Sequence, residues 1–423
     1  MTVADRPLLL VVGKGSRVYR EYLLRAVAGD WRVWLLCDSP PEWEARYLAG
    51  HVVVDTADAG AMIGPARALR PDGVVTWDDT RVVQAATVAE ALGLPGSPPE
   101  AALACRDKHL TRTALAAAGV PQAASVLVGS LAEAREAAEA IGYPVVVKPR
   151  ALNASAGVVL VESADQLAGR FRLARGAAMP GVRITEVAPG GVLVEEYLDG
   201  PEISVDAAWQ AGRMTVTLVA RKWTGFPPCF EEVGHLVDGA DPLLTDPAVA
   251  AVVAAAHEAV GFHTGWTHTE LRLTPAGPRV VEINARIGGD RIPDVGRLAL
   301  GVDAGRVAAT IACGGSPSLR PTHQRVAAVR FLYPAEDGIV REVRVDRDRL
   351  PAGVDSVDVI AVPGQELRLP PAGHVTSRYA LVTAVADSQE RCRAALDAAE
   401  SAVHLETLRP RPARQPARRP AAR

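Results

Sequence analysis

The chain reads Tyr143-Pro144-Val145-Val146-Val147-Lys148-Pro149-Arg150 at the point that decides its fold, and Ala151-Leu152-Asn153-Ala154-Ser155-Ala156-Gly157-Val158 follows. The run of valines predicts a buried β-strand that ends at Lys148. The small side chains after it allow backbone N–H groups to approach phosphate oxygens, which the Lys148 ammonium group can also reach. We therefore expect a phosphate-binding loop in which Ser155, Ala156 and Gly157 contact a nucleotide. The alternative is an ordinary hairpin with a surface lysine.

The use of lysine supports this interpretation. Only four of the 46 basic residues are lysines, and the chain has only two asparagines. These six residues are Lys14, Lys108, Lys148, Lys222, Asn153 and Asn284. Since lysine is a compact point charge and arginine a planar fork, each retained lysine is a candidate for chemistry that arginine cannot perform.

The bulk composition is that of a soluble globular protein, with 48% hydrophobic and 22% charged residues and a net charge of −3. We therefore expect small-molecule substrates, with neither nucleic acid nor a membrane surface as a partner. The N-terminus contains Asp5, and the apolar run Leu8–Val12 is too short for a signal peptide or a membrane span. The five cysteines stand singly, without metal-binding spacing. We expect a cytoplasmic protein.

The order of apolar runs predicts an α/β and α+β multidomain protein. Alternating strand and helix patterns over 1–100 predict a Rossmann-like domain with a parallel sheet. In that domain Gly13-Lys14-Gly15 predicts a tight turn. An α+β unit is predicted over 101–320, with a smaller subdomain at about 122–198. A strand-rich α+β domain follows over 321–408, and its last helix is expected to run from Ser388 to His404. Residues 409–423 form an Arg/Pro-rich tail that is predicted to be disordered.

Acidic residues follow the apolar strand in Leu193-Val194-Glu195-Glu196-Tyr197-Leu198-Asp199-Gly200-Pro201-Glu202. A strand edge of this kind can offer backbone groups to a purine and a carboxylate to ribose hydroxyls. We expect the nucleotide to contact Glu195, Glu196, Leu198 and Glu202. A hairpin with solvated acids is the alternative.

A third pattern predicts a metal site. Strand patterns at Trp266–Leu271 and Val280–Asn284 flank Pro275-Ala276-Gly277-Pro278 and predict a hairpin. Glu282 and Asn284 have the period-two spacing of a strand and share one face, which Glu270 can join. Two carboxylates and an amide oxygen suit Mg²⁺, with Mn²⁺ as a substitute. Arg286 comes next on that face and suits a phosphoryl or carboxylate group. Structural carboxylates on a polar strand face are the alternative.

Taken together, these features resemble the ATP-grasp superfamily over about residues 1 to 315. The resemblance implies that Lys108 and Lys148 are its nucleotide lysines and that 151–158 is its phosphate loop. It also implies an adenine hinge with a ribose carboxylate over 195–202, a magnesium triad of Glu270, Glu282 and Asn284, and an N-terminal pre-ATP-grasp domain.

Within that superfamily the chain resembles bacterial L-amino-acid ligases of the bacilysin dipeptide-synthase type. The residues that carry this resemblance are Glu231-Glu232-Val233-Gly234-His235 and the segment from Glu282 to Pro293. The resemblance implies that Glu232 and His235 lie near the acyl substrate and that Arg286 contacts its carboxylate or acyl phosphate. Asp290 stands where the dipeptide synthase carries a bulky aromatic residue, so specificity for the amine is not transferred.

The expected function is an ATP-dependent carboxylate–amine ligase that forms an acyl phosphate and releases ADP and phosphate. We expect Lys222 to close over the γ-phosphate and the enzyme to be a homodimer. The alternatives are a purine-pathway ligase or a carboxylase on the same fold, and a non-catalytic ATP-binding module that recruits a peptide or carrier protein.

Overall fold

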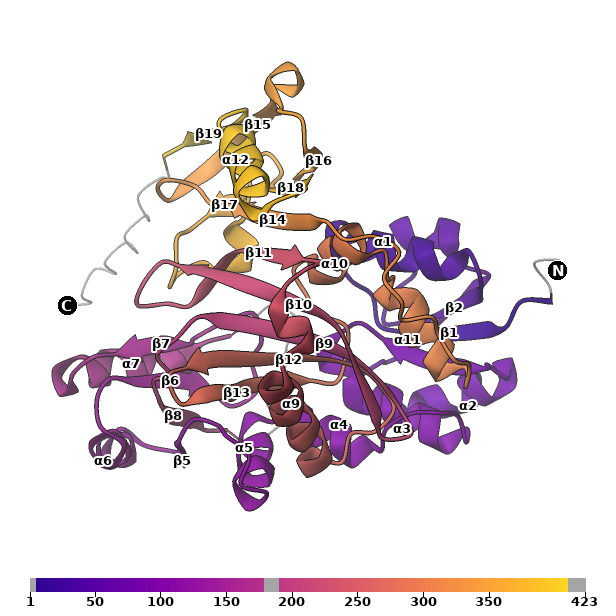
Figure 1. The fold of residues 1–423 in the computed structure, drawn as a ribbon, viewed down its shortest axis with the longest axis horizontal. Helices are drawn as coiled ribbons and strands as arrows, with labels where there is room; N and C mark the ends of the chain where they lie inside the picture. The colour runs from indigo at the N-terminus through magenta and orange to yellow at the C-terminus, as the bar shows by residue number, and fades with distance from the viewer. Residues whose placement is uncertain (1–4, 179–189, 410–423) are drawn as a thin grey trace, which may run out of the picture.

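The computed structural model describes residues 5–178 and 190–409. The tail predicted to be disordered lies, apart from Arg409, outside the described residues. Four sheets organise the described chain, as Figure 1 shows, with the N-terminal part at one side and the C-terminal part above the central sheet. The mixed α/β architecture confirms the predicted fold class.

The N-terminal sheet is parallel, as predicted, with the order β3-β2-β1-β4. Its strands and helices are β1 (Leu8–Val12), α1 (Arg17–Ala28), β2 (Arg32–Cys37), β3 (Gly50–Val53), α2 (Ala59–Leu69), β4 (Gly73–Thr76) and α3 (Val82–Ala91). Strand β1 is buried on both faces, because Leu9 and Val11 belong to one apolar cluster and Leu10 and Val12 to another.

A four-stranded antiparallel sheet has the order β5-β8-β6-β7. Its elements are β5 (Ser125–Val128), α6 (Leu131–Ile141), β6 (Val145–Pro149), β7 (Val159–Val161), α7 (Ala164–Gly176) and β8 (Val192–Glu196). Strand β6 ends one residue after Lys148, so the phosphate-binding loop predicted after that lysine connects β6 to β7.

The largest sheet has the order β13-β12-β9-β10-β11-β14-β18-β16. Its strands are β9 (Glu202–Gln210), β10 (Arg213–Gly225), β11 (Glu231–Asp238), β12 (Gly265–Thr274), β13 (Gly277–Asn284), β14 (Val326–Leu332), β16 (Val354–Val359) and β18 (Ala380–Ala386). The associated helices are α4 (Pro99–Arg106), α5 (Lys108–Ala117), α9 (Pro247–Val260), α10 (Ile292–Leu300) and α11 (Ala304–Ala312). The sheet runs across the boundary predicted near residue 321, because β11 pairs with β14.

The C-terminal helix is shorter than the sequence pattern predicts. Helix α12 (Gln389–Glu400) ends before Ser401, and β19 (Val403–Leu408) follows it and pairs with β15 (Gly338–Val345). Strand β15 also pairs with the short β17 (Glu366–Leu367) in a three-stranded sheet. The helix prediction to His404 is wrong because side chains alternate between partly buried and exposed along β19, which is the period of a strand.

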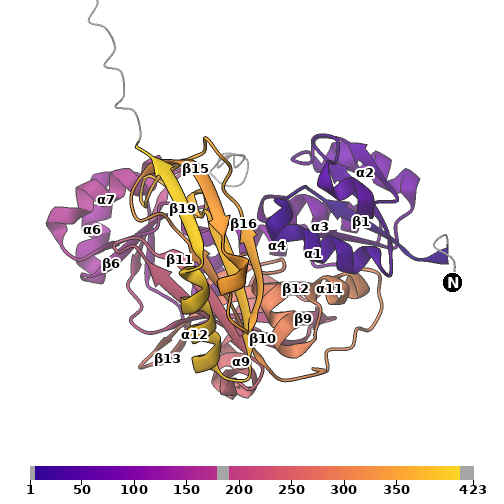
Figure 2. The ribbon, with the colours of Figure 1, turned by 90° about the horizontal axis from the view of Figure 1, so that it is seen from above.

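One apolar cluster joins the N-terminal domain to the central sheet. It contains Leu23 and Val27 of α1 together with Val307 and Ile311 of α11. Helix α1 lies beside α11 in both Figure 1 and Figure 2. This contact places the carboxyl ends of the parallel strands next to the large sheet. No helix within the described ranges is both long and apolar enough to cross a membrane.

Replacing Gly73 by alanine should weaken this docking. A Cβ atom at Gly73 would lie 2.7 Å from the carbonyl carbon of Ala312 and 2.8 Å from the sulfur of Cys313. Overpacking of this kind typically costs about 1–3 kcal/mol. The urea midpoint of Gly73→Ala should therefore fall. Gly64→Ala in α2 is the matched control, since a Cβ there meets nothing within 4 Å, and its midpoint should stay or rise. Equal midpoints for the two variants would contradict the docking contact.

Candidate active site

A pocket with about 890 Å³ of empty space, part of it open to solvent, lies between β6 and β8 on one side and the β12–β13 hairpin on the other. It brings together residues that are far apart in the sequence. The predicted site residues that line it are Lys108, Lys148, Ser155, Glu195, Glu196, Leu198, Glu202, Glu232, Glu270, Glu282, Asn284 and Arg286.

Four predicted residues do not line this pocket, namely Ala156, Gly157, Lys222 and His235. Ala156 is buried, and Gly157 has φ +73° with a position where a Cβ would lie 2.9 Å from Cγ of Pro149. Position 157 therefore requires glycine because of its positive φ and because the residue packs closely against Pro149. The structure does not bring Gly157 to the wall of the pocket, where a phosphate could bind. Ala154 and Ser155 before it also have positive φ, which is unusual outside glycine and frequent at functional loops.

Lys148 is held by a buried carboxylate. Its Nζ lies 2.6 Å from Oε2 of Glu195, and Arg112 makes two hydrogen bonds of 2.7 and 3.0 Å to the same carboxylate. Burial alone would raise the pKa of Glu195, but Arg112 and Lys148 lower it to about 2. The Glu195 side chain is thus engaged inside the protein. It positions Lys148 at the pocket.

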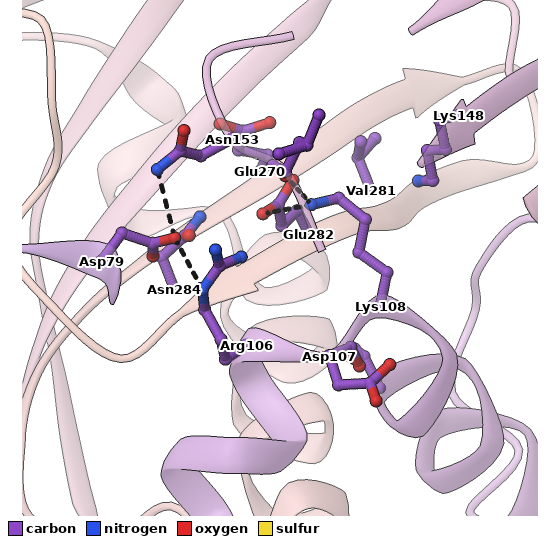
Figure 3. A network of polar contacts seen from close by, with 12 residues as sticks. Asp79, Arg106, Asp107, Lys108, Lys148, Asn153, Glu270, Val281, Glu282 and Asn284 are labelled. Atoms are coloured by element: carbon purple, nitrogen blue, oxygen red, sulfur yellow. Dashed lines mark hydrogen bonds and ion pairs between the residues drawn. The ribbon is translucent and has the colours of Figure 1, made fainter. Parts of the chain in front are cut away.

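Lys108 makes two contacts from the start of α5. Its Nζ donates to the carbonyl oxygen of Leu152 at 2.6 Å and lies 3.0 Å from Oε1 of Glu282. Figure 3 shows this lysine pointing toward Glu282, with Glu270 close by. Lys108 therefore connects the phosphate-binding loop to the β12–β13 hairpin.

The β12–β13 register places two acids opposite each other. Glu270 pairs directly with Glu282, and His268 with Asn284. Like charges directly opposite on neighbouring strands are destabilising, so this pair needs cations. Lys108 and Lys222 supply positive charge at one oxygen of each acid. Carboxylate and amide oxygens that face a pocket suit Mg²⁺, and the predicted triad therefore fits this ion.

Lys222 lies among three carboxylates. Its Nζ is 2.8 Å from Oε1 of Glu202 and 2.9 Å from Oε1 of Glu270, and it also forms an ion pair with Glu232. Burial lowers the pKa of Lys222, but these three charges outweigh it and raise the pKa well above its ordinary value. The lysine is therefore a counter-ion of the acids, and the geometry does not support the expected closure over a γ-phosphate.

A cluster of Glu232, His235 and Asp290 lies next to the pocket, with its ligand atoms within 4.8 Å of one another. Such a set could hold a metal, but cations already match both carboxylates. Lys222 pairs with Glu232, and Arg378 makes two 2.8 Å hydrogen bonds to Asp290. The pKa of His235 is raised, because the carboxylates of Asp290 and Glu232 beside its Nε2 atom outweigh the effect of burial.

Family models match two segments of the chain. Residues 141–294 match the ATP-grasp domain, and residues 330–408 match the L-amino acid ligase C-terminal domain 2. The uncharacterised protein y4rH of Sinorhizobium fredii is 30% identical over 343 residues, which cover 79% of this chain and 69% of that protein. The chain belongs to the ATP-grasp ligases.

Two further relatives extend the comparison. Human carnosine synthase 1 is 31% identical over 344 residues, which cover 75% of this chain and 41% of the synthase. The crystal structure of an L-amino acid ligase from Bacillus licheniformis superposes with a TM-score of 0.79 at 22% identity, over 96% of this chain and all of that chain. This likeness confirms the ATP-grasp fold. The predicted membership in the superfamily, with its relation to amino acid ligases, is also confirmed.

One acid near Arg286 comes from the N-terminal domain of this ATP-grasp ligase and was not predicted from the sequence. Asp79, after β4, is 6% exposed and lies 3.1 Å from both Arg286 and Arg106. Asn153 of the phosphate-binding loop also approaches it, at 3.4 Å (Figure 3). The two arginines are the main reason that the pKa of Asp79 falls to about 2 despite its burial. Its position at the carboxyl end of a parallel strand was the available signal.

Replacing Glu195 by glutamine should destabilise the protein strongly. The change leaves Arg112 and Lys148 buried without a matching charge, which typically costs about 3–5 kcal/mol. Glu196→Gln is the matched control, because the neighbouring carboxylate pairs with Arg279 while both side chains are partly exposed. That variant should lose at most about 1 kcal/mol. Chemical denaturation measures both, and equal losses would show that the Glu195 pairs do not stabilise the subdomain.

The contribution of Glu195 should also depend on pH. Its pKa in the folded protein, about 2, lies below the ordinary value of 4.5. The ionised carboxylate therefore stabilises the fold fully above pH 4.5, and this stabilisation is lost as the pH falls from 4.5 toward 2. The difference in unfolding free energy between wild type and Glu195→Gln should shrink over that range. A difference independent of pH would contradict the ion-pair assignment.

Proposed function

We propose that this chain uses ATP to activate the carboxylate of an amino acid as an acyl phosphate and then joins it to an amine. ADP and inorganic phosphate are the other products. The observation that carries the proposal is the pocket in which Lys148, Lys108 and the Glu270–Glu282 pair share a cavity with Arg286 and Glu232. A nucleotide half and a carboxylate-binding half therefore meet in one site.

In the proposed reaction the side chains of the pocket bind and orient the two reacting groups and stabilise their negative charge. Lys148 and Lys108 bind phosphate oxygens of ATP, and Arg286 binds the carboxylate that attacks the γ-phosphate. Asp79 fixes the direction of Arg286, because its Oδ1 atom accepts a hydrogen bond from Nε of Arg286 at 3.1 Å. The terminal nitrogens donate to the carbonyl oxygen of Ile287 and to Oδ1 of Asn284. A preorganised cation at the transferring phosphoryl group stabilises charge in the transition state without reorganisation.

Glu270, Glu282 and Asn284 would hold Mg²⁺ together with the ATP phosphates. When bound, the ion neutralises the phosphate charge that would otherwise repel an attacking carboxylate. Each of these glutamates contacts its lysine through Oε1, and its Oε2 would be the oxygen offered to the ion.

An amino group on the acyl donor would meet the carboxylate of Glu232, which lines the same pocket as Arg286. Glu202, Glu232 and Glu270 share Lys222, and Arg272 makes a further ion pair with Glu202. Glu232 shares Lys222 with two other acids, so its carboxylate can also accept from a substrate ammonium group. A fatty acid would offer no such cation. The homodimer and the cytoplasmic location remain predictions from the sequence.

The direct test is ATP-dependent trapping of the activated acid by hydroxylamine. Acyl hydroxamate and ADP should form in equal amounts with α- or β-amino acids, identified by mass. Activation of non-amino acids alone would contradict the assignment of the donor and leave the phosphoryl transfer standing. ATP binding without turnover of any acid would instead favour the non-catalytic binding module.

Glu282→Gln should abolish this activity while the protein remains folded. The change removes a carboxylate that lies opposite Glu270, so repulsion within the hairpin falls while the metal site loses one charge. ADP formation should drop by roughly 100-fold or more, and Mg²⁺–ATP should no longer raise the melting temperature. Glu342→Gln on the exposed β15 surface is the control. Wild-type turnover by a folded Glu282→Gln variant would contradict the metal assignment.

Glu232→Ala should raise the KM for the amino acid donor more than it lowers kcat. Loss of a charged hydrogen bond to a substrate typically costs about 1.5–3 kcal/mol, which corresponds to roughly 10- to 100-fold in affinity. Initial rates of hydroxamate formation give both constants. An unchanged KM would place the substrate amino group elsewhere.

A further inference from the structure

A buried acid lies in the middle of β9, next to the hairpin that presents the acids of the pocket. Asp206 is 0% exposed, and the residues on either side of it, Val205 and Ala207, belong to an apolar cluster. In the pairing of β9 with β12, His268 lies opposite Asp206. A carboxylate in such surroundings is costly unless a cation and hydrogen-bond donors match it.

Side chains of β12 engage both oxygens of Asp206. Oδ1 lies 2.6 Å from Nδ1 of His268, and Oδ2 accepts a hydrogen bond of 3.0 Å from Nε1 of Trp266. His268 and Trp266 are themselves buried. Trp266 also packs in the apolar cluster that joins the N-terminal domain to the central sheet. Asp206 therefore holds the His268 ring in one orientation.

The other ring nitrogen of His268 faces an acid of the pocket. Trp266, His268 and Glu270 have the period-two spacing of a strand and share one face of β12. Nε2 of His268 lies 3.6 Å from Oε1 of Glu270. Since ionised carboxylates only accept hydrogen bonds, an imidazole between two of them carries a hydrogen on each nitrogen. His268 is thus a buried cation that connects Asp206 to Glu270.

Two cations meet at the same oxygen of Glu270. Nζ of Lys222 on β10 lies 2.9 Å from Oε1, the atom that also faces His268 on β12. Contacts from two strands restrict rotation of the carboxylate, and Oε2 would then be the oxygen offered to an ion. Neither His268 nor Asp206 is among the residues that line the pocket. Their effect on an ion is therefore exerted through Glu270.

The segment after β13 packs closely on this pair of side chains. A Cβ atom at Gly288 would lie 2.8 Å from Nδ1 of His268 and 3.3 Å from Oδ2 of Asp206. A methyl group at position 288 would therefore displace the ring or the segment. At the next residue, Gly289, a Cβ atom meets nothing within 4 Å. The close contact thus belongs to Gly288 alone of these two glycines.

We propose that Asp206 and His268 are positioning residues for the metal site, because together they fix the Glu270 carboxylate in the orientation that binds a divalent cation beside ATP. The inference rests on the proposed function, which assigns Glu270 to Mg²⁺. Residues that orient the ligands of a metal typically contribute about 10- to 100-fold to its affinity. Without the pair, Lys222 alone would set the direction of the Glu270 carboxylate.

The test measures binding of Mn²⁺ at equilibrium. Mn²⁺ is titrated into the protein with ADP kept below the protein concentration, and the free ion is followed by its electron paramagnetic resonance signal. His268→Gln should raise the Kd for Mn²⁺ about 10- to 100-fold, and Asp206→Asn should also raise it. The Kd for ADP in EDTA should change less than about twofold in both variants, because neither residue lines the pocket.

His257→Gln is the matched control for His268→Gln. His257 is also fully buried, but it lies on α9, where its Nδ1 atom contacts the carbonyl oxygen of Val253. Its variant should bind Mn²⁺ as the wild type does. A folded His268→Gln variant with the Mn²⁺ affinity of the wild type would overturn the proposal, and a lowered melting temperature as its only change would show a purely structural role.

Two glycine variants test the same idea without removing either side chain. Gly288→Ala should weaken Mn²⁺ binding, whereas Gly289→Ala should leave it unchanged. If His268→Gln fails to fold, this pair decides, and equal Mn²⁺ affinities of the two glycine variants would overturn the proposal.

Failure of the proposed function would have a different signature. A wild-type protein that binds ADP but not Mn²⁺ would contradict the metal assignment, and this inference with it. Absence of hydroxamate with every acid would contradict the proposed function alone, because the binding measurements need no turnover.

Discussion

Shared counter-ions hold the active site together. Three carboxylates surround the Nζ atom of Lys222, and one of them, Glu270, lies directly opposite Glu282 across the hairpin. Buried acids at such distances repel one another unless cations intervene, and removing one partner leaves an uncompensated charge. Lys108 and Lys222, two of the lysines retained by this lysine-poor chain, therefore stabilise the acids that line the pocket.

Buried ion pairs also connect the domains. Asp79 comes from the N-terminal sheet, Arg106 from the end of α4 and Arg286 from the segment after β13, and their charges meet in one buried network. A salt bridge of this kind adds little stability over apolar packing, but it fixes geometry. Here it fixes the arginine assigned to the acyl group relative to the phosphate-binding loop. Arg378 from the C-terminal part holds Asp290 in the same segment after β13, so side chains from three parts of the chain fix that segment.

Local patterns predicted those parts of the structure that depend on neighbouring residues. The valines before Lys148 form β6, and the predicted hairpin forms with Glu270 and Glu282 facing each other, because strand period and register are encoded over a few residues. The partners of Glu195 and Arg286 could not be predicted, since Arg112 lies 83 residues from Glu195 and Asp79 lies 207 residues from Arg286. The environment of Lys222 could not be predicted for the same reason, because the three acids around it come from separate strands. The sequence alone therefore suggested a phosphate as its partner. Residues 403–408 were assigned partly to a helix because a short strand after a helix is recognised mainly by its pairing partner.

The central claim is that the carboxylate of an amino acid attacks the γ-phosphate of ATP. The most direct test uses an amino acid donor labelled with ¹⁸O in its carboxylate, with the released phosphate analysed by mass spectrometry. An acyl phosphate transfers one carboxylate oxygen to phosphate when the amine displaces it. One ¹⁸O atom is therefore expected in each phosphate released during amide formation. Phosphate free of the label, with ADP still produced, would mean that water attacks ATP and would contradict the account.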